Sequence, residues 1–341
     1  MKKIALLSLC LLLVLALGLF TVSSWWQQGG TGQGTVLLEI REGSSLTRVA
    51  GQLSDKKLLN YPRLWRLMTR WQQLDGSIKP GEFELEYSMS PAQLLQALVA
   101  GKVRQYQVTL PEGITLTQAL AILHSKNTLR AELDGALDPR LLDMVQPHLS
   151  TEGWFFPDTY SYTKGTSDLQ ILHMAYRRMQ EVLTQSWQSR ASGLPYTTAY
   201  EALIMASIVE RETGVARERG EIAGVFVRRL FKKMKLQTDP TIIYGLGERY
   251  DGNIRRSHLK DESNPYNTYR HGGLPPGPIG LPGAAAIAAA LHPEPGKSLY
   301  FVARGDGSHQ FSETFEEHKA AVARYQLQRR EDYRSSPPTE Q

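Results

Sequence analysis

The chain has 341 residues, enough for two or three domains, and its 41% hydrophobic and 21% charged content is that of a folded protein. Its net charge of +5 is small for this length, and no dense block of Lys and Arg interleaves with aromatic residues, so nucleic acid is not expected as a partner. The only cysteine, Cys10, lies in an apolar N-terminal run, which excludes internal disulfides and cysteine-based metal or thiol chemistry in the folded part.

The N-terminus has the pattern of a membrane anchor. Lys2 and Lys3 precede an uncharged apolar run, Ile4 to Val22, and the pair Trp25-Trp26 follows. Such a run is long enough to span a bilayer, the tryptophans suit its far interface, and the lysines keep the N-terminus cytoplasmic. A cleaved signal peptide is the alternative, but the run continues without a good small-residue cleavage site. The expected segments are a cytoplasmic tail (1–3), a transmembrane anchor (4–26) and a glycine-rich flexible linker (27–35).

An internal repeat comes next. The stretch Arg41 to Ala50 matches Pro111 to Leu120: each follows an alternating strand, turns at Glu-Gly and enters a helix through a Ser or Thr N-cap. After the first copy the pattern predicts a helix from Pro62 to Gln72, a strand from Glu82 to Tyr87 and a helix from Pro91 to Ala100. This strand-helix-helix-strand unit (36–105) resembles the LysM-like modules that bind amino-sugar polymers. A plain α+β spacer is the alternative.

Residues 106–330 are expected to form a larger mixed α+β domain, so that the whole chain is α+β, and the polar tail 331–341 is expected to be disordered. The predicted elements are helices within Leu116–Gln146, an aromatic loop (Glu152–Tyr160), helices at Asp168–Gln188, Thr198–Thr213 and Arg217–Met234, a loop-rich stretch (Leu236–Ile279), a helix (Gly283–Leu291), a strand (Leu299–Ala303), a turn (Gly305–Gly307) and a helix (Thr314–Arg329).

The helix Thr198–Thr213 carries carboxylates at the end of an apolar run. Because its residues from Ala202 to Val209 are apolar around almost the whole circumference, it is expected to be buried. Glu212 falls on the apolar arc, whereas Glu210 projects roughly 160° away, so the two are not expected to point into one cleft. Gly214 is the expected C′ residue. An apolar wall and a helix C-terminus both raise a carboxyl pKa, as a general acid requires. A structural Glu paired with a nearby arginine is the alternative.

Amide, hydroxyl and aromatic side chains in the loops are what sugar recognition uses. The candidates for binding a sugar are Trp154, Gln237, Thr241, Tyr244, Asn267 and Tyr269. Asp158 and Asp239 are candidates for the second carboxylate of an ordinary glycosidase, but a lone Glu suits a reaction in which the substrate supplies its own nucleophile. The dispersed histidines and the lack of a phosphate-binding loop indicate that no metal and no cofactor is needed.

Four stretches carry a resemblance to a known family: EGWFFPDTY from Glu152, ASIVERETG from Ala206, LQTDPT from Leu236, and NTY followed by GLPPGPI from Asn267. From about residue 39 to 325 the chain resembles the endolytic murein transglycosylases, the YceG-like family. The resemblance implies lytic cleavage of peptidoglycan between N-acetylmuramic acid and N-acetylglucosamine, with Glu212 as the catalytic residue and 1,6-anhydro ends as the product.

The resemblance also implies a place of action. It implies a protein anchored in the cell inner membrane with a periplasmic catalytic domain that cuts nascent glycan strands beside the peptidoglycan synthases (penicillin-binding proteins). Two alternatives to this function are a muramidase that uses water and a non-enzymatic scaffold that binds peptidoglycan.

Overall fold

The computed structural model describes residues 2–327, so the tail expected to be disordered lies outside the described residues. The chain is mixed α+β, as predicted, and divides into two compact units. Unit 1 consists of Met1–Tyr106 and Ser161–Gly165, and unit 2 of Gln107–Tyr160 and Thr166–Gln341. The sequence analysis placed the short segment Ser161–Gly165 in the domain 106–330, but in the structure this segment belongs to unit 1.

The centre of unit 1 is a two-stranded sheet with helices on one side. Its elements are α1 (Lys2–Gln27), β1 (Thr35–Ile40), α2 (Leu46–Asp55), α3 (Pro62–Trp71), β2 (Gly81–Glu86) and α4 (Pro91–Ala100). β1 and β2 are antiparallel, with Thr35 opposite Glu86. Leu38 and Phe83 point inward from the two strands and pack with Trp65 of α3 in the core. The strand-helix-helix-strand order predicted for this part is therefore confirmed.

Helix α1 contains a 22-residue stretch, Leu6–Gln27, that is long and apolar enough to cross a membrane; one such helix near the N-terminus fits an anchor or a signal sequence. Its last turn belongs to unit 1, because Trp26 is 7% exposed and lies in the core of that unit. The following glycines, expected as a flexible linker, lie against the turn after β2. Gly30 N–H donates to the carbonyl of Ser88 (3.0 Å), and a Cβ at Gly30 would collide with the carbonyl oxygen of Tyr87.

The first part of unit 2 contains the second copy of the repeat. Its helices are α5 (Leu116–His124) and α6 (Pro139–Met144), and the paired strands β3 (Gln105–Thr109) and β4 (Thr159–Thr163) each contain residues of both units. Thr115 caps α5 in a capping box with Gln118, as the Thr N-cap predicted. β4 begins in residues that the sequence analysis assigned to a loop.

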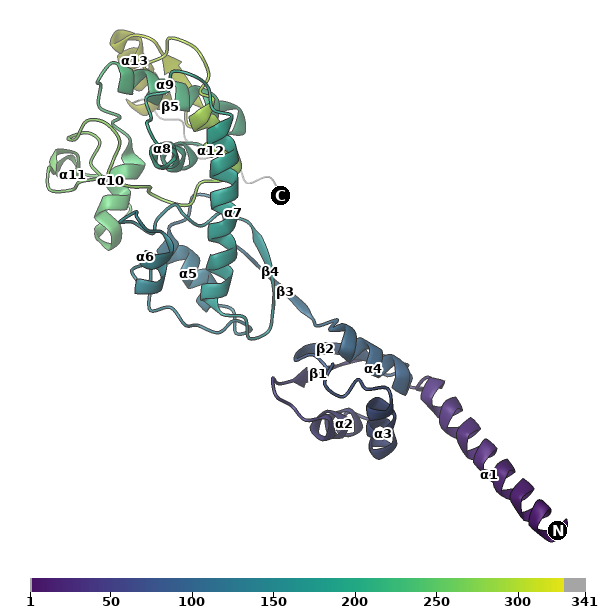
Figure 1. The fold of residues 1–341 in the computed structure, drawn as a ribbon. Coiled ribbons are helices and arrows are strands. Elements are labelled where there is room, and N and C mark those ends of the chain that lie inside the picture. Colours follow the sequence, from purple (N-terminus) through teal and green to yellow (C-terminus); the bar gives the residue numbers. More distant parts are fainter. Residues whose placement is uncertain (1, 328–341) are drawn as a thin grey trace. The chain divides into compact units, whose positions relative to one another are not determined.

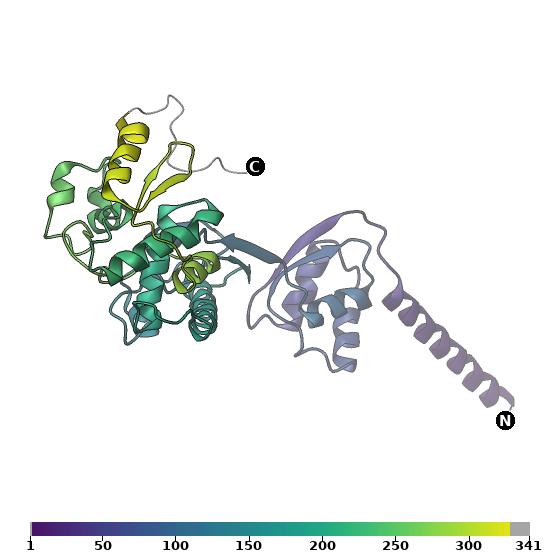
Figure 2. The ribbon, with the colours of Figure 1, turned by 90° about the horizontal axis from the view of Figure 1, so that it is seen from above.

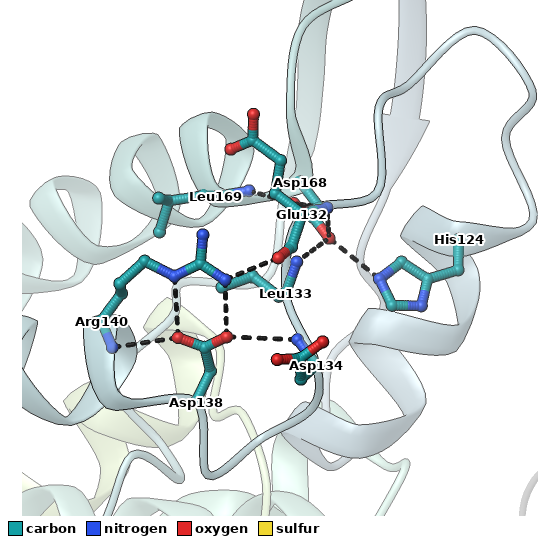
Figure 3. A network of polar contacts seen from close by, with 8 residues as sticks. All are labelled: His124, Glu132, Leu133, Asp134, Asp138, Arg140, Asp168 and Leu169. Carbon is teal, nitrogen blue, oxygen red and sulfur yellow. Dashed lines mark hydrogen bonds and ion pairs between the residues drawn. The ribbon is translucent and has the colours of Figure 1, made fainter.

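A buried polar network holds the irregular chain between α5 and α6 (Figure 3). Asp168 is fully buried, accepts the N–H groups of Glu132 and Leu133 at 3.1 Å, and pairs with His124 Nε2 at 2.9 Å. Next to it Asp138 binds the Arg140 guanidinium at 2.7 Å, which lowers the pKa of Asp138. A buried carboxylate is tolerated when its oxygens are satisfied in this way.

The core of unit 2 is a group of helices around α8 (Ala199–Glu212). Its neighbours are α7 (Asp168–Gln188), α9 (Arg219–Phe231, after a 3-10 turn at Ala216–Glu218) and α12 (Ala284–Leu291). Figure 1 shows α8 beside α12, and α7 contacts both of these helices. Six of the eight residues of α12 are alanines, and small side chains let two helix backbones approach closely.

The stretch after α9 is more helical than predicted. It contains α10 (Asp239–Leu246), a 3-10 turn (Gly247–Arg249) and α11 (Arg256–Lys260). The pair Asp239-Pro240, which lies in the stretch predicted to be loop-rich, begins α10. Proline is compatible with the first turn of a helix, where its missing N–H costs no hydrogen bond.

The C-terminal part is a hairpin with a helix beside it, drawn in yellow in Figure 2. It comprises β5 (Tyr300–Ala303), β6 (His309–Ser312), α13 (Phe315–Val322) and a π-helical turn (Ala323–Leu327). β5 and β6 are antiparallel, with Tyr300 opposite Ser312. The predicted turn between them is confirmed, since Gly305 and Gly307 both have positive φ, but β6 was not predicted.

Candidate active site

Helix α8 ends at the candidate catalytic residue, Glu212. The helix begins with a capping box between Thr198 and Glu201, and every residue from Ala202 to Val209 is buried, as its apolar circumference predicted. Its end differs from the prediction. Thr213 follows the helix in an extended conformation, and its hydroxyl accepts a hydrogen bond from Val215 N–H. Gly214 does not adopt the left-handed conformation expected of a C′ residue.

Glu212 is half-buried. The hydroxyl of Thr238 donates to Glu212 Oε1. Burial raises the pKa of Glu212 to about 7, and the charge of Asp239 adds to this, while the Thr238 hydrogen bond and the charge of Arg229 oppose it. The predicted direction of the pKa shift is therefore confirmed, and at neutral pH the group is available both as an acid and as a base.

Glu210 borders the same cleft, but its carboxylate is bound on another side. Oε1 accepts from Arg219 at 3.2 Å and Oε2 from the N–H of Gly283 at 2.9 Å. The two carboxylates have different partners, but both line one cleft, so the expectation that they do not point into one cleft is not confirmed. Burial raises the pKa of Glu210, but both of its oxygens are already engaged by protein donors.

A cleft of about 790 Å³ lies next to the end of α8. Its lining comes from the loop before α10, the hairpin β5–β6 and α13, all within unit 2. The lining side chains used below are Glu212, Arg229, Gln237, Asp239, Tyr269, Tyr300, Phe301, His309, Phe315 and His318. Ring faces, an amide and carboxylates around one open groove are groups that bind the hydroxyls and C–H faces of sugars.

Two of the sequence-predicted binding residues lie in this cleft. Gln237 is exposed in the lining, with a positive φ of 53°, and its N–H donates to the carbonyl of Thr268. Tyr269 lines the cleft and donates its hydroxyl to Asp239 at 2.8 Å. Asp239 itself lines the cleft, whereas Asp158 is not among the lining residues.

Thr241 and Asn267 lie elsewhere, fully buried among backbone groups. The Thr241 hydroxyl donates to the carbonyl of Thr238 at 2.7 Å, and the Asn267 amide donates to the carbonyl of Asp261 at 2.7 Å. Neither side chain is exposed for the sugar contact that the sequence analysis expected, and we correct that expectation for both residues. These side chains satisfy the backbone of the loops that carry Thr238 and Tyr269, and so position cleft residues without lining the cleft.

Tyr244 and Trp154 are also placed outside the cleft. Tyr244 donates to Glu152 at 3.3 Å, and burial raises the pKa of Glu152 to about 7. Trp154 is 7% exposed and stacks on Tyr200, with ring centroids 5.6 Å apart and planes at 3°. The aromatic loop therefore packs inside unit 2, which corrects the expectation that Trp154 binds substrate.

The sequence analysis missed the aromatic wall of the cleft. Tyr300 of β5 and His318 of α13 stack with centroids 5.1 Å apart, and both line the cleft. His309 pairs with the buried Glu218 at 2.8 Å, which fastens β6 to the turn before α9. A signal was present in the aromatic residues Tyr300, Phe301 and Phe311, but nothing local indicated that this segment borders the same cleft as Glu212.

Arg229 connects the two walls of the cleft. It is 7% exposed and donates to the carbonyls of Leu299 and Leu236, both at 2.7 Å, and its guanidinium lies 5.2 Å from the ring centroid of Tyr300. The planar guanidinium of Arg229 thus binds the segment that leads into the hairpin through one nitrogen and the loop that contains Gln237 through another.

Comparison with known proteins links this chain to one family. Residues 38–324 match the YceG-like family. An endolytic murein transglycosylase of Bacillus subtilis is 31% identical over 309 residues, 85% of each chain, and one of Streptococcus pneumoniae serotype 2 is 28% identical over 85% of this chain and 58% of its own length. A solved yceG-like protein of Listeria monocytogenes is 29% identical with a TM-score of 0.51, covering 85% of this chain and 99% of that one.

Proposed function

Because this chain belongs to the YceG-like family, we propose that unit 2 is a peptidoglycan lytic transglycosylase in which Glu212 is the catalytic acid and base. The chain is an endolytic murein transglycosylase, a lyase-type enzyme that acts within glycan strands. One observation carries the assignment of the residue: Glu212 lies in the cleft of unit 2 with a pKa of about 7.

The reaction uses the two protonation states of Glu212 in turn. The protonated carboxyl donates to the glycosidic oxygen between N-acetylmuramic acid and N-acetylglucosamine, and the C1–O bond breaks. The resulting carboxylate takes the proton of the C6 hydroxyl of the muramic acid, whose oxygen bonds to C1 and closes the 1,6-anhydro ring. Water is not consumed, and the enzyme ends in its initial protonation state.

The walls of the cleft have different tasks in this proposal. Gln237 supplies an amide for sugar hydroxyls, Tyr269 and Tyr300 supply ring faces, and Thr238 holds the Glu212 carboxyl. A hydrolytic muramidase would need a second carboxylate to activate water. Asp239 is the remaining candidate in the lining, because Glu210 is engaged by Arg219 and Gly283.

Digestion of purified glycan strands tests the proposal. Glu212→Gln keeps the size of the side chain but removes the acid, and should abolish cleavage while strands still bind. Glu210→Gln is the matched control two residues away and should leave anhydro products. Cleavage by Glu212→Gln together with loss of cleavage in Glu210→Gln would refute the assignment. Wild-type products that carry one extra water would indicate a muramidase, and uncut strands a scaffold.

We further propose that α1 holds the enzyme in the cell inner membrane, with the N-terminus cytoplasmic and both units in the periplasm. The apolar stretch Leu6–Gln27 supports this, as does Trp26, whose place in the core of unit 1 ties the helix to the folded protein. Cleavage after α1 would remove this indole from the core. The mature chain should therefore keep its N-terminus, which mass spectrometry of the membrane fraction would check.

Two finer assignments belong to the same proposal. Unit 1 acts as a LysM-like glycan-binding module, supported by its strand-helix-helix-strand order and by the paired β1 and β2. A tether would also keep the active site close to newly made strands, where penicillin-binding proteins work, so that cleavage terminates elongation. Crosslinking of the Glu212→Gln chain in cells should recover these synthases; recovery of none would contradict the partnership.

A further inference from the structure

Helix α3 of unit 1 exposes a face that combines large apolar side chains with positive charge. Arg63, Leu67, Arg70 and Trp71 are spaced by four, seven and eight residues, so they project from one side of the helix. Leu67 is 64% exposed and Trp71 is 77% exposed. The opposite side of the helix is buried in the core, so α3 lies flat against the unit.

The charge of this face has one sign. The helix contains three arginines and no acidic residue. Arg66 turns toward α2 and donates to Thr47 at 2.7 Å, while Arg63 and Arg70 are exposed on the apolar face. A face with arginine, leucine and tryptophan and without carboxylates or amides fits an anionic lipid surface better than it fits the hydroxyls of a glycan.

The end of α1 lies at the beginning of α3. The ring of Trp25 in the last turns of α1 meets that of Tyr61, the N-cap residue of α3, edge to face with centroids 5.8 Å apart. Tyr61 is itself 60% exposed. A pocket of about 580 Å³ between these segments is lined by Val22, Trp25, Tyr61 and Leu64. The end of α1 therefore lies close to the start of α3.

We propose that α3 lies in the headgroup layer of the membrane that α1 crosses, with Leu67 and Trp71 at the boundary of the acyl chains and Arg63 and Arg70 on lipid phosphates. The inference rests on the proposed role of α1 as an anchor. Amphipathic helices with basic and aromatic residues bind in the plane of the interface, and each arginine adds to the attraction of anionic lipid. The contact gives unit 1 a fixed face toward the bilayer.

Site-directed spin labelling of the full-length chain tests this proposal. Cys10 is the only cysteine, so Cys10→Ser provides a cysteine-free background. Leu67→Cys places a label on α3. Leu37→Cys is the matched control, since Leu37 is an exposed leucine of the same unit that lies on β1, outside α3. The wild-type chain labelled at Cys10 reports on α1.

Accessibility to oxygen and to a water-soluble nickel chelate is measured in phosphatidylcholine nanodiscs with and without phosphatidylglycerol. We expect the Leu67 label to be accessible to oxygen and protected from nickel in anionic discs, and the Leu37 label to show the opposite. Arg63→Gln with Arg70→Gln should lower the ratio of lipid-embedded to water-exposed label by roughly thirty-fold at low salt, from the usual contribution of two arginines.

The outcomes separate the two levels of the proposal. Lipid exposure at Cys10 together with full nickel access at Leu67 would overturn the α3 inference and leave the anchor intact. Water exposure at Cys10 would overturn both. Protection of Leu67 that needs added glycan strands, or that grows with protein concentration in detergent, would assign this face to glycan or to a second copy and also overturn the inference.

Discussion

The substitution Thr238→Val should change the pKa of the Glu212 carboxyl group by removing a single hydrogen-bond donor, the Thr238 hydroxyl. The substitution removes the hydroxyl that donates to Glu212 Oε1 and keeps the branched shape of a side chain that is 2% exposed. This hydrogen bond favours the ionised carboxylate, and burial favours the protonated one. Without the hydroxyl we expect the pKa of Glu212 to rise above its present value of about 7.

The size of the effect follows from acid catalysis by Glu212. A group with a pKa of about 7 is roughly nine-tenths protonated at pH 6 and one-tenth at pH 8, so wild-type kcat/KM should fall about tenfold between them. A hydrogen bond to a charged group contributes about 1.5–3 kcal/mol, and one pKa unit corresponds to about 1.4 kcal/mol. The alkaline limb of the Thr238→Val profile should therefore lie about one to two pH units higher.

The assay follows the release of anhydro ends from glycan strands across pH 5–9. Thr241→Val is the matched control, because the Thr241 hydroxyl is bonded to the carbonyl of Thr238 and not to Glu212. It should leave the limb where it is in the wild type. An unchanged limb in Thr238→Val, or a limb at lower pH, would refute the role of this hydroxyl and the assignment of the limb to Glu212.

Three further predictions concern stability and binding. Glu152 has a folded pKa of about 7 against an ordinary 4.5, so its contribution to stability is full below pH 4.5 and is lost as pH rises through 7; relative to wild type, Glu152→Gln should gain about 2 kcal/mol from pH 5 to pH 8 in urea unfolding, and a relative loss would contradict this. Asp168→Asn weakens the acceptor of three backbone N–H groups, and should lower the free energy of unfolding by about 2–4 kcal/mol. A loss well below this range would contradict a structural role for the network. Tyr300→Ala removes a ring face from the cleft and should raise KM several-fold with little change in kcat; an unchanged KM would remove Tyr300 from the binding surface.

Local signals in the sequence were sufficient for most helices. Thr198 with Glu201 marks the start of α8, Gly101 ends α4 in a left-handed turn, and the apolar circumference of α8 predicts its burial. Glu212 could be identified because a carboxylate on the apolar arc of a buried helix is a local anomaly. These features depend on residues within a few turns of one another.

The rest of the site depends on contacts between distant segments. A hydroxyl or amide in a loop has the same appearance in sequence whether it faces a sugar or the backbone, so Thr241 and Asn267 were assigned to the cleft although they are buried inside their loops. Tyr300 and His318 line the same cleft as Glu212 only because of the packing of the C-terminal hairpin, which Arg229 fixes from α9. No spacing in the sequence encodes that approach.

The segment Ser161–Gly165 has a consequence for how such chains can vary. Because unit 1 takes this strand segment from the middle of the catalytic sequence, unit 1 is not a continuous cassette. A recombination event that replaced residues 1–106 would leave Ser161–Gly165 behind, with Lys164 deprived of its carboxylate partners Glu39 and Glu82. Sequence change in residues 1–106 is therefore coupled to a segment that the chain encodes more than fifty residues later.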